Sequence, residues 1–234
     1  MKYMGSKRRI AKEILPIILK DRKENQWYVE PFVGGANMID KVTGNRIGSD
    51  VNPYLIALLK YIQIDSFSLP DITEEKYKHI QTYKELYPEW LVGYVGFCLS
   101  FGAKFFGGYG RDKAGKRDYQ KEAKLNLKKQ SENIKGIHFY NVNYTDVEIP
   151  PESIIYCDPP YQGTTKYKNG IDHNIFWQWC RGKIREGHSV FVSEYTAPDD
   201  FKCIWQKEVC NSLTQDTGSK KGIEKLFTGD INGD

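Results

Sequence analysis

The fold of this chain is decided by residues 27–52, which read WYVEPFVGGANMIDKVTGNRIGSDVN. Residues 27–30 and 46–50 have the length and apolar composition of short buried strands. Between them, Gly34-Gly35 predicts a turn, and the apolar residues from 36 to 44 predict a helix that stops at a glycine. A strand, a turn, a helix and a second strand form a βαβ unit, which predicts a parallel sheet covered by helices on both faces.

Flanking segments extend this α/β pattern. Residues 6–19 have the spacing of an amphipathic helix, with Ser6 as N-cap and Pro16 as a point where the helix should bend or shorten. Three further strands are predicted at 137–140, 153–157 and 189–193. Helical periodicity prevails from 53 to 135. We therefore expect a helical inserted domain, residues 53–135, in an α/β core formed by residues 1–52 and 136–234.

Composition restricts the class of protein. Of the 234 residues, 40% are hydrophobic and the mean hydropathy is −0.59, as in a folded globular chain rather than a disordered one. No apolar run reaches the roughly 18 residues that span a bilayer. The basic N-terminus is not followed by the apolar stretch of a signal peptide. We expect a cytoplasmic protein without a membrane segment.

Cysteine and histidine usage argues against a disulfide framework and a metal centre. The five cysteines are scattered and include no CxxC pair, so we expect reduced thiols in the core of a cytosolic protein. The four histidines show no HExxH or other ligand spacing, and we expect no metal.

The turn after the first predicted strand is a candidate binding site. In Glu30-Pro31-Phe32-Val33-Gly34-Gly35, the paired glycines let the backbone approach a ligand closely at the carboxyl edge of a parallel sheet. Asp50 follows Glu30 by twenty residues, the spacing at which a carboxylate accepts hydrogen bonds from ribose hydroxyls. Neither GxGxxG nor the phosphate-binding GxxxxGK pattern is present. The turn therefore predicts a site for a nucleoside-containing cofactor rather than a phosphate cradle.

A second candidate site is Asp158-Pro159-Pro160-Tyr161, directly after the apolar stretch 154–157. The Asp158 carboxylate and the Pro159 carbonyl are suited to accept both N–H bonds of a planar exocyclic amine, while the Tyr161 ring stacks on the base. With both protons held by acceptors, the amine nitrogen becomes pyramidal and exposes its lone pair to an electrophile, without prior loss of a proton. The ordinary alternative is a proline turn at a sheet edge.

Five sequence blocks occur in an order that resembles one family. They are Tyr3-Met4-Gly5-Ser6-Lys7, the Glu30–Gly35 block, Ser49-Asp50-Val51-Asn52, the Asp158–Tyr161 block and Ser193-Glu194-Tyr195. Together they resemble the Dam-type, D12 class DNA adenine-N6 methyltransferases over nearly the whole chain. The resemblance implies a Rossmann-like S-adenosylmethionine-dependent methyltransferase fold, with a catalytic core and an inserted, mainly helical DNA-binding domain.

The resemblance also implies roles for individual residues. S-adenosylmethionine is the expected methyl donor, bound by Tyr3, Lys7, Phe32, Gly34, Asp50, Asn143, Tyr144 and Asp158. The expected catalytic residues are Asp158, Pro159 and Tyr161. Tyr3 replaces a tryptophan that is frequent in the family, and Ala36-Asn37 replaces its more usual Gly or Ser. The ordinary alternatives are an exposed helix lysine at position 7, terminal packing of Tyr3, a strand end at 143–144 and a helix N-cap at Asp50.

Positive charge is concentrated in two segments, although the net charge of the whole chain is only +4. Residues 2–24 have a net charge of +5 and residues 103–135 of +6, which leaves −7 for the rest. In the second segment, basic and aromatic side chains alternate around glycines, which is typical of a surface that contacts nucleic-acid backbone. The expected DNA-binding residues are Lys104, Tyr109, Arg111, Lys113, Lys116, Arg117 and, in a predicted hairpin tip at 217–222, Lys220. For Trp90, Tyr94 and Phe97 we expect burial in the insertion rather than contact with bases.

These features predict an enzyme that methylates N6 of an adenine flipped out of duplex DNA. The alternatives are methylation of cytosine N4 or of RNA adenine, and a catalytically silent nucleic-acid-binding protein on the same scaffold. Asp158 favours adenine, because cytosine-N4 enzymes more often have serine at that position. We expect a monomer or weak dimer that acts on double-stranded DNA in a bacterial or phage-infected cell. The sequence does not determine the target site, for which GATC is only a guess. It also does not distinguish roles in restriction–modification, phage protection and housekeeping.

Overall fold

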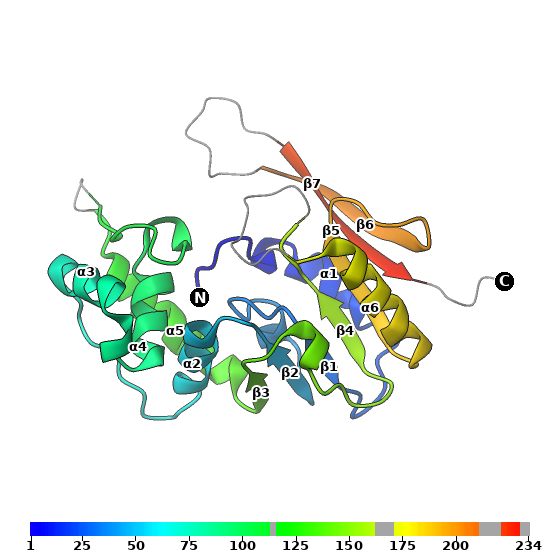
Figure 1. Ribbon diagram of the computed structural model, residues 1–234, viewed down its shortest axis with the longest axis horizontal. Coiled ribbons are helices and arrows are strands. Elements are labelled where there is room, and N and C mark those ends of the chain that lie inside the picture. The colour runs from blue at the N-terminus through cyan, green and yellow to red at the C-terminus, as the bar shows by residue number, and fades with distance from the viewer. Residues whose placement is uncertain (113–115, 162–170, 211–220, 230–234) are drawn as a thin grey trace.

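The computed structural model describes residues 1–112, 116–161, 171–210 and 221–229. Within these residues the chain forms a seven-stranded sheet in the order β3-β2-β1-β4-β5-β7-β6 (Figure 1). The strands are β1 (Tyr28–Glu30), β2 (Arg46–Ser49), β3 (Ile137–Tyr140), β4 (Ile154–Cys157), β5 (Ser189–Glu194), β6 (Phe201–Cys210) and β7 (Lys221–Gly229). Strands β1 to β5 run parallel, whereas β7 lies antiparallel between β5 and β6. The mostly parallel α/β sheet predicted from the sequence is confirmed.

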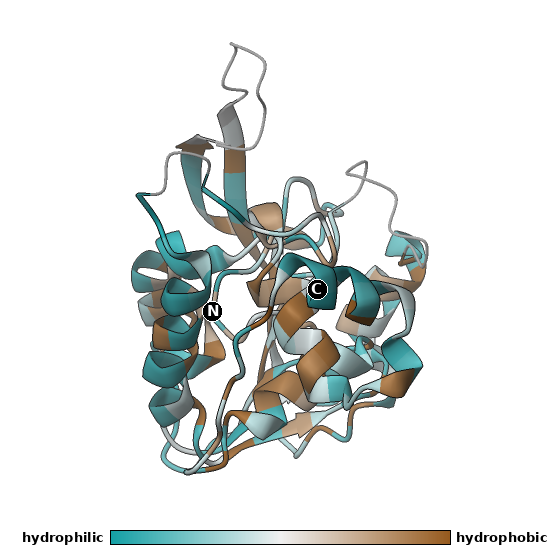
Figure 2. Ribbon diagram, turned by 90° about the vertical axis from the view of Figure 1, so that its left-hand side faces the viewer, coloured by the Kyte–Doolittle hydropathy of each residue, from teal (hydrophilic) through white to brown (hydrophobic). Residues whose placement is uncertain are grey.

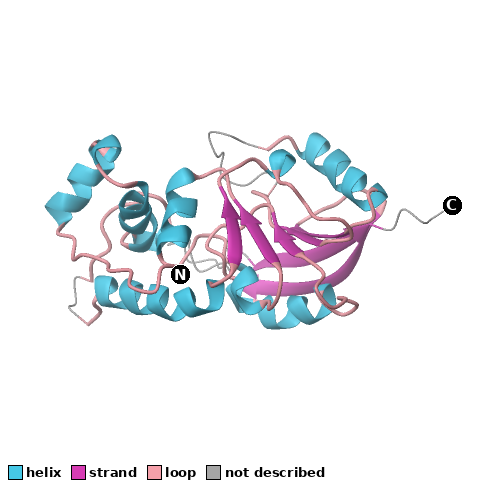
Figure 3. Ribbon diagram, turned by 90° about the horizontal axis from the view of Figure 1, so that it is seen from below, coloured by secondary structure: helices cyan, strands magenta, loops and turns pink. Residues whose placement is uncertain are grey.

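Two helices cover opposite faces of this sheet (Figure 3). Helix α1 (Ala11–Ile18) buries Ile14 and Ile18 in one apolar cluster, and α6 (His173–Arg185) buries Phe176 in another. Successive side chains of β4 alternate between the two clusters, because strand side chains point to opposite faces in turn. Since both faces are covered, the parallel strands read as continuous apolar runs.

The remaining helices gather at the β3 end of the sheet, on the left of Figure 1. They are α2 (Pro53–Tyr61), α3 (Glu74–Thr82), α4 (Glu89–Gly93) and α5 (Tyr119–Ile134). Figure 2 faces this side and shows hydrophilic and hydrophobic residues on the same helices, as amphipathic helices require. Tyr94 and Phe97 are buried here, and Trp90 stacks on Tyr61 with ring centroids 3.9 Å apart. The expected burial therefore holds for Tyr94 and Phe97, whereas Trp90 is half-buried.

Arg46 joins the end of α5 to strand β2. Arg46 on β2 donates hydrogen bonds to the carbonyls of Asn133 at 2.8 Å and Lys135 at 2.6 Å, at the end of α5. These carbonyls have no partner within the helix, so the buried guanidinium satisfies them and caps the helix.

The predicted helix over residues 36–44 is wrong. Only a three-residue 3-10 turn, Ile39–Lys41, forms within it. Gly34 and Ala36 have φ angles of 48° and 54°. The backbone is therefore left-handed where a right-handed helix would have to begin.

The predicted helix over residues 6–19 forms in two parts. A 3-10 turn, Lys7–Arg9, is capped by Ser6, whose Oγ accepts a hydrogen bond from the N–H of Arg8 at 3.3 Å. Helix α1 follows, includes Pro16 and ends at Ile18. No described helix is long and apolar enough to cross a membrane.

The expectation that the cysteines are core residues holds in part. Cys157 and Cys180 are buried and Cys98 is half-buried, but Cys203 is exposed. Cys203 lies on β6, the edge strand of the sheet, where one side has no neighbouring strand to cover it.

Candidate active site

The carboxyl ends of three parallel strands bring the predicted motifs to one edge of the sheet. Strand β1 lies between β2 and β4 and is parallel to both. The glycine turn follows β1, Asp50 follows β2 and Asp158 follows β4. In open α/β sheets, ligands bind in the crevice at these carboxyl ends. The edge is therefore the place where segments distant in sequence form one site.

Asp50 holds the glycine turn through its carboxylate. Its Oδ2 accepts a hydrogen bond from the backbone N–H of Gly34 at 3.2 Å, and its Oδ1 accepts one from Asn52 at 2.9 Å. Burial raises the pKa of Asp50, and the two N–H bonds partly offset this rise by stabilising the charged form. The side chain of Asn52 caps α2 by accepting a bond from the N–H of Leu55 at 3.1 Å. Asp50 is therefore not the cap of this helix.

The glycine pair makes room for Tyr3. A Cβ added at Gly34 would lie 2.9 Å from Cε1 of Tyr3, and a Cβ added at Gly35 would lie 2.6 Å from its Cβ. Real Cβ atoms do not approach other atoms so closely, so a larger residue at either position must displace Tyr3. The Tyr3 ring also packs on Phe97 of the helical group, with centroids 5.7 Å apart. Tyr3 thus contacts both the turn and the helices.

Lys7 and Asp158 form an ion pair at the end of β4. Nζ of Lys7 lies 3.0 Å from Oδ1 of Asp158, and the two side chains are 7% and 21% exposed. Burial alone would lower the pKa of Lys7, but the carboxylates of Asp158 and Glu224 outweigh burial and raise it. Burial raises the pKa of Asp158 against the opposing effect of Lys7. Lys7 is therefore a buried partner of Asp158, not an exposed helix lysine.

Tyr161 lies beside the same ammonium group. Nζ of Lys7 is 4.5 Å from the centroid of the Tyr161 ring. The Tyr161 hydroxyl donates a hydrogen bond to Oε2 of Glu224 at 2.7 Å, and this oxygen is 3.6 Å from Nζ of Lys7. Tyr195 packs edge-on against Tyr161, with centroids 4.6 Å apart and an interplanar angle of 80°. We call Lys7, Asp158, Tyr161 and Glu224 the Lys7 cluster.

Glu224 is the member of the Lys7 cluster that the sequence does not predict. It lies on β7, 63 residues after Tyr161, as a single acid in a strand-like stretch without a motif. The pairing of β7 with β5 places Leu226 opposite Ser193 and Lys225 opposite Glu194. This register sets Glu224 beside the end of β5, and nothing local in the sequence predicts a pairing between such distant segments.

Like Tyr3, Gly34 and Asp50, the predicted cofactor-binding residues Phe32, Asn143 and Tyr144 lie outside the Lys7 cluster. The rings of Phe32 and Tyr144 stack with centroids 5.1 Å apart, and both pack on Phe176 of α6. Tyr144 is 8% exposed. Asn143 caps the short turn Tyr144–Asp146 by accepting a hydrogen bond from the N–H of Thr145 at 3.4 Å. Strand β3 has already ended at Tyr140, so this segment is a capped turn rather than the strand end of the ordinary alternative. Contact with a cofactor stays a prediction.

Comparison with known proteins identifies the family. The sequence model of one protein family, described as "D12 class N6 adenine-specific DNA methyltransferase", matches residues 3–90 and 91–202 of this chain. The chain belongs to this family. The family uses S-adenosylmethionine as methyl donor. The resemblance inferred from the five sequence blocks is therefore confirmed, and with it the expected cofactor.

A curated relative and two solved structures are similar to this D12 family member. The type II methyltransferase M.FokI of Planomicrobium okeanokoites is 25% identical over 207 residues, which make up 77% of this chain and 31% of that protein. The tRNA (m1A58) methyltransferase TrmI of Aquifex aeolicus has a TM-score of 0.39 and 12% identity, over 93% of this chain and 68% of its own. SMU.472, in complex with SAH, has a TM-score of 0.38 and 11% identity, over 96% and 53%. This chain thus spans about a third of M.FokI.

The site of this D12 family member fits the cofactor at Asp50. The Asp50 carboxylate accepts two N–H bonds, and a carboxylate has about four lone-pair positions, so it retains acceptors for ribose hydroxyls. Gly34 and Gly35 have no Cβ, and the space that a Cβ would fill is taken by Tyr3, which the resemblance also places at the cofactor. Asp50 and the glycine turn are the residues that would hold the nucleoside part.

The arginines predicted to bind DNA are already paired with acids in the structure. Arg111 donates a hydrogen bond to Glu74 at 3.0 Å. Arg117 donates two bonds of 2.8 Å to Glu122 and lies over the Tyr119 ring. The bonds from Arg117 and from Lys2 lower the pKa of Glu122 to about 2. A phosphate that binds these arginines therefore competes with an existing acid partner.

The other residues predicted to bind DNA have different surroundings. Lys104 and Lys116 are exposed. The hydroxyl of Tyr109 donates a hydrogen bond to the carbonyl of Ile72 at 2.9 Å, which ties its ring to the helical group. Lys113 and Lys220, with most of the predicted hairpin tip, lie outside the described residues.

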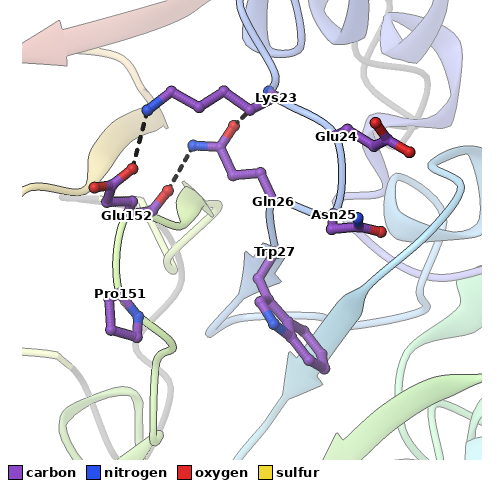
Figure 4. Close-up of a pocket in the computed structure, with 7 residues that line it drawn as sticks. All are labelled: Lys23, Glu24, Asn25, Gln26, Trp27, Pro151 and Glu152. Atoms are coloured by element: carbon purple, nitrogen blue, oxygen red, sulfur yellow. Dashed lines mark hydrogen bonds and ion pairs between the residues drawn. The ribbon is translucent and has the colours of Figure 1, made fainter.

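A pocket at the amino ends of the strands is separate from the Lys7 cluster (Figure 4). It lies just before β1 and β4, where Lys23 pairs with Glu152 at 2.9 Å and Gln26 donates to the Glu152 carbonyl at 2.5 Å. The backbone N–H of Lys23 also donates to Oε1 of Gln26 at 2.9 Å, so Lys23, Gln26 and Glu152 bond to one another there. Among the described residues, no group of three or more His, Cys, Asp or Glu side chains is arranged to hold a metal ion.

Proposed function

We propose that this D12 family member transfers the methyl group of S-adenosylmethionine to the exocyclic N6 of an adenine in duplex DNA. The observation that carries the proposal is the arrangement at the end of β4, where Asp158 is followed by the buried Pro159 and by the Tyr161 ring. The similarity to a type II methyltransferase supports a site-specific reaction on DNA. When bound, S-adenosylmethionine supplies an electrophilic methyl group.

The residues at the sheet edge divide the binding task. Asp50 accepts hydrogen bonds from the ribose hydroxyls, and the glycine turn that it holds lies against the nucleoside. Tyr3 fixes the turn from the side of the helical group. Because these residues are held by buried contacts, they present a preorganised site to the cofactor.

Asp158 acts on the amine of the target adenine. Its carboxylate and the Pro159 carbonyl accept the two N–H bonds of N6, and the Tyr161 ring stacks on the base. The nitrogen lone pair would then form the new bond to the methyl carbon, while the bond from that carbon to the sulfonium sulfur breaks and leaves its electron pair on sulfur. The nitrogen gains a positive charge and loses one proton, and the proton in the bond to Asp158 is placed to leave. The raised pKa of Asp158 makes this carboxylate a better proton acceptor than an exposed aspartate.

Access to N6 in this position requires the base to leave the duplex. Flipping costs a few kcal/mol of stacking and pairing. Contacts between phosphates and basic side chains offset this cost. The positive segment 103–135, with a net charge of +6, is the proposed source of those contacts.

Replacement of Asp158 tests the proposal. We expect Asp158→Ala to lower the methyl-transfer rate constant by at least about 100-fold, because it removes one preorganised acceptor, while DNA affinity is retained. The rate is measured as transfer of labelled methyl groups from S-adenosylmethionine to DNA, and the affinity by fluorescence anisotropy. Asp199→Ala is the matched control, since Asp199 is an exposed aspartate in the turn before β6. Methyl transfer by Asp158→Ala at the rate of the wild type would overturn the mechanism.

A further inference from the structure

Glu224 connects two members of the Lys7 cluster that have different tasks. Its Oε2 accepts the hydroxyl hydrogen bond of Tyr161 at 2.7 Å and lies 3.6 Å from Nζ of Lys7. The Glu224 side chain is 14% exposed, so water screens its charge only weakly. Glu224 therefore acts on the ring that stacks and on the cation that pairs with Asp158.

The charges of the Lys7 cluster do not cancel. Lys7 contributes +1, and Asp158 and Glu224 each contribute −1, so the cluster has a net charge of −1. The ammonium group of Lys7 also donates to the Gly5 carbonyl at 3.2 Å, which holds it in place at 7% exposure. With Glu224 neutral, the ammonium and the Asp158 carboxylate would form a cluster of net charge zero.

The sign of this charge matters for the proposed reaction. The amine nitrogen becomes positive as it bonds to the methyl carbon, and a cation beside Asp158 opposes that change. A second carboxylate near the ammonium group offsets the unfavourable effect of that cation on the positive nitrogen. In a partly buried site such a fixed charge is worth more than it is in water.

We propose that Glu224 is a positioning residue that keeps the Lys7 cluster negative and holds the Tyr161 ring in place during methyl transfer. This inference rests on the proposed function. Glu224 does not touch the adenine and acts through Lys7 and Tyr161. In the free protein, the charge of Glu224 raises the pKa of Asp158. It also raises the pKa of Lys7, on which only the charge of Asp158 has a larger raising effect.

The first test compares Glu224→Gln with the wild type in single-turnover methylation of DNA. The substitution keeps an oxygen that accepts the Tyr161 bond and removes only the charge. We expect the rate constant to fall about 10- to 100-fold, with the dissociation constants of cofactor and DNA unchanged. Glu208→Gln is the matched control, because Glu208 is an exposed glutamate on the neighbouring strand β6. Glu224→Asp restores the charge and should recover part of the lost rate.

Two outcomes of this test overturn the proposal. One is a wild-type rate constant for Glu224→Gln. The other is a loss that falls entirely on the dissociation constants, which would make Glu224 a binding or structural residue. Failure of the proposed function is distinct, because it shows as wild-type protein that forms no N6-methyladenine.

A second measurement separates the charge of Glu224 from its hydrogen bond and does not depend on activity. The pKa of Lys7 is followed by NMR of its ¹³Cε in the wild type, Glu224→Gln and Tyr161→Phe. We expect Glu224→Gln to lower this pKa, since it removes a carboxylate 3.6 Å from Nζ, and Tyr161→Phe to lower it less. An unchanged Lys7 pKa in Glu224→Gln would contradict the charge coupling even in a protein without activity.

Discussion

At the scale of single residues, the buried carboxyl group of Glu30 lies at the end of β1, next to the glycine turn. Glu30 is 3% exposed, and its Oε1 accepts a hydrogen bond from the hydroxyl of Tyr28 at 2.9 Å. Burial raises the pKa of Glu30 well above its ordinary value, the Tyr28 bond lowers it, and the charge of Asp158 adds to the rise. The folded protein therefore favours the neutral form of Glu30. At pH values where the unfolded chain ionises Glu30, this preference lowers the free energy of unfolding.

Glu30→Gln is expected to stabilise the protein more at pH 8 than at pH 5. The folded-state pKa of Glu30 lies above its unfolded value, so its contribution is most favourable below about pH 4.5 and is lost as pH rises through the folded value. Glutamine keeps the Tyr28 bond without an ionisable group, and the difference should be at least about 1 kcal/mol in the free energy of unfolding. Urea denaturation at the two pH values measures it.

Glu122 provides the control of opposite sign. Arg117 and Lys2 lower its pKa to about 2, so its contribution is present above its unfolded pKa and is lost only in acid. Glu122→Gln should therefore show no stabilisation at pH 8. A gain for Glu30→Gln that is equal at the two pH values would contradict the burial argument.

Prediction from sequence succeeds at this scale where a motif is local. Asp50, Asp158 and Tyr161 directly follow predicted strands, and parallel strands bring such positions to one edge. Glu224 is not predicted, because its place depends on the pairing of β7 with β5 across a long separation in sequence. Side-chain partners that are distant in sequence, such as Glu74 for Arg111, escape prediction for the same reason.

At the scale of elements, helices α2 and α4 of the helical group pack in close backbone contact. A Cβ added at Gly93 on α4 would lie 2.1 Å from the carbonyl oxygen of Tyr54 on α2. The sequence predicts helical structure here, but not which helices touch. It also predicts a helix over residues 36–44 from apolar spacing alone, whereas the positive φ of Ala36 prevents one. Apolar spacing is therefore a better predictor of which residues are buried than of the backbone conformation in that segment.

Gly93→Ala should destabilise the protein by about 1–3 kcal/mol or more, because the backbone of α2 must move away. The free energy of unfolding from urea denaturation measures the effect. Gly182→Ala on α6 is the matched control, since a Cβ there meets no atom within 4 Å and alanine favours a helix by about 1 kcal/mol. Equal stabilities for the two variants would show that α2 and α4 do not pack as described.

At the scale of the whole molecule, the excess positive charge is less available than the sequence suggests. Arg111 and Arg117 in the segment 103–135 form ion pairs with acids, as do Lys124 and Lys135. Exposed pairs of this kind contribute about 0–1 kcal/mol each, so they exchange partners at small cost. Among the described residues of that segment, Lys104 is exposed and has no acid within ion-pair distance.

Lys104→Ala and Arg117→Ala should therefore differ in DNA binding. Loss of a free lysine that contacts a phosphate reduces the slope of log K against log salt by about 0.9. Arg117→Ala should reduce the slope less, because Arg117 must first leave Glu122. The dissociation constant for a DNA duplex, measured by fluorescence anisotropy across a salt series, gives both slopes. Equal reductions would show that the ion pairs of the free protein have no influence on DNA contact.

The central claim, methylation of adenine N6 in DNA, is tested most directly by analysis of the product nucleosides. Duplex DNA and RNA are incubated separately with the wild-type protein and labelled S-adenosylmethionine, digested to nucleosides and analysed by mass spectrometry. Methyl acceptance through Asp158 and Tyr161 predicts labelled N6-methyldeoxyadenosine from DNA, and its loss in Asp158→Ala. Label in N4-methyldeoxycytidine, or in RNA alone, would contradict the account.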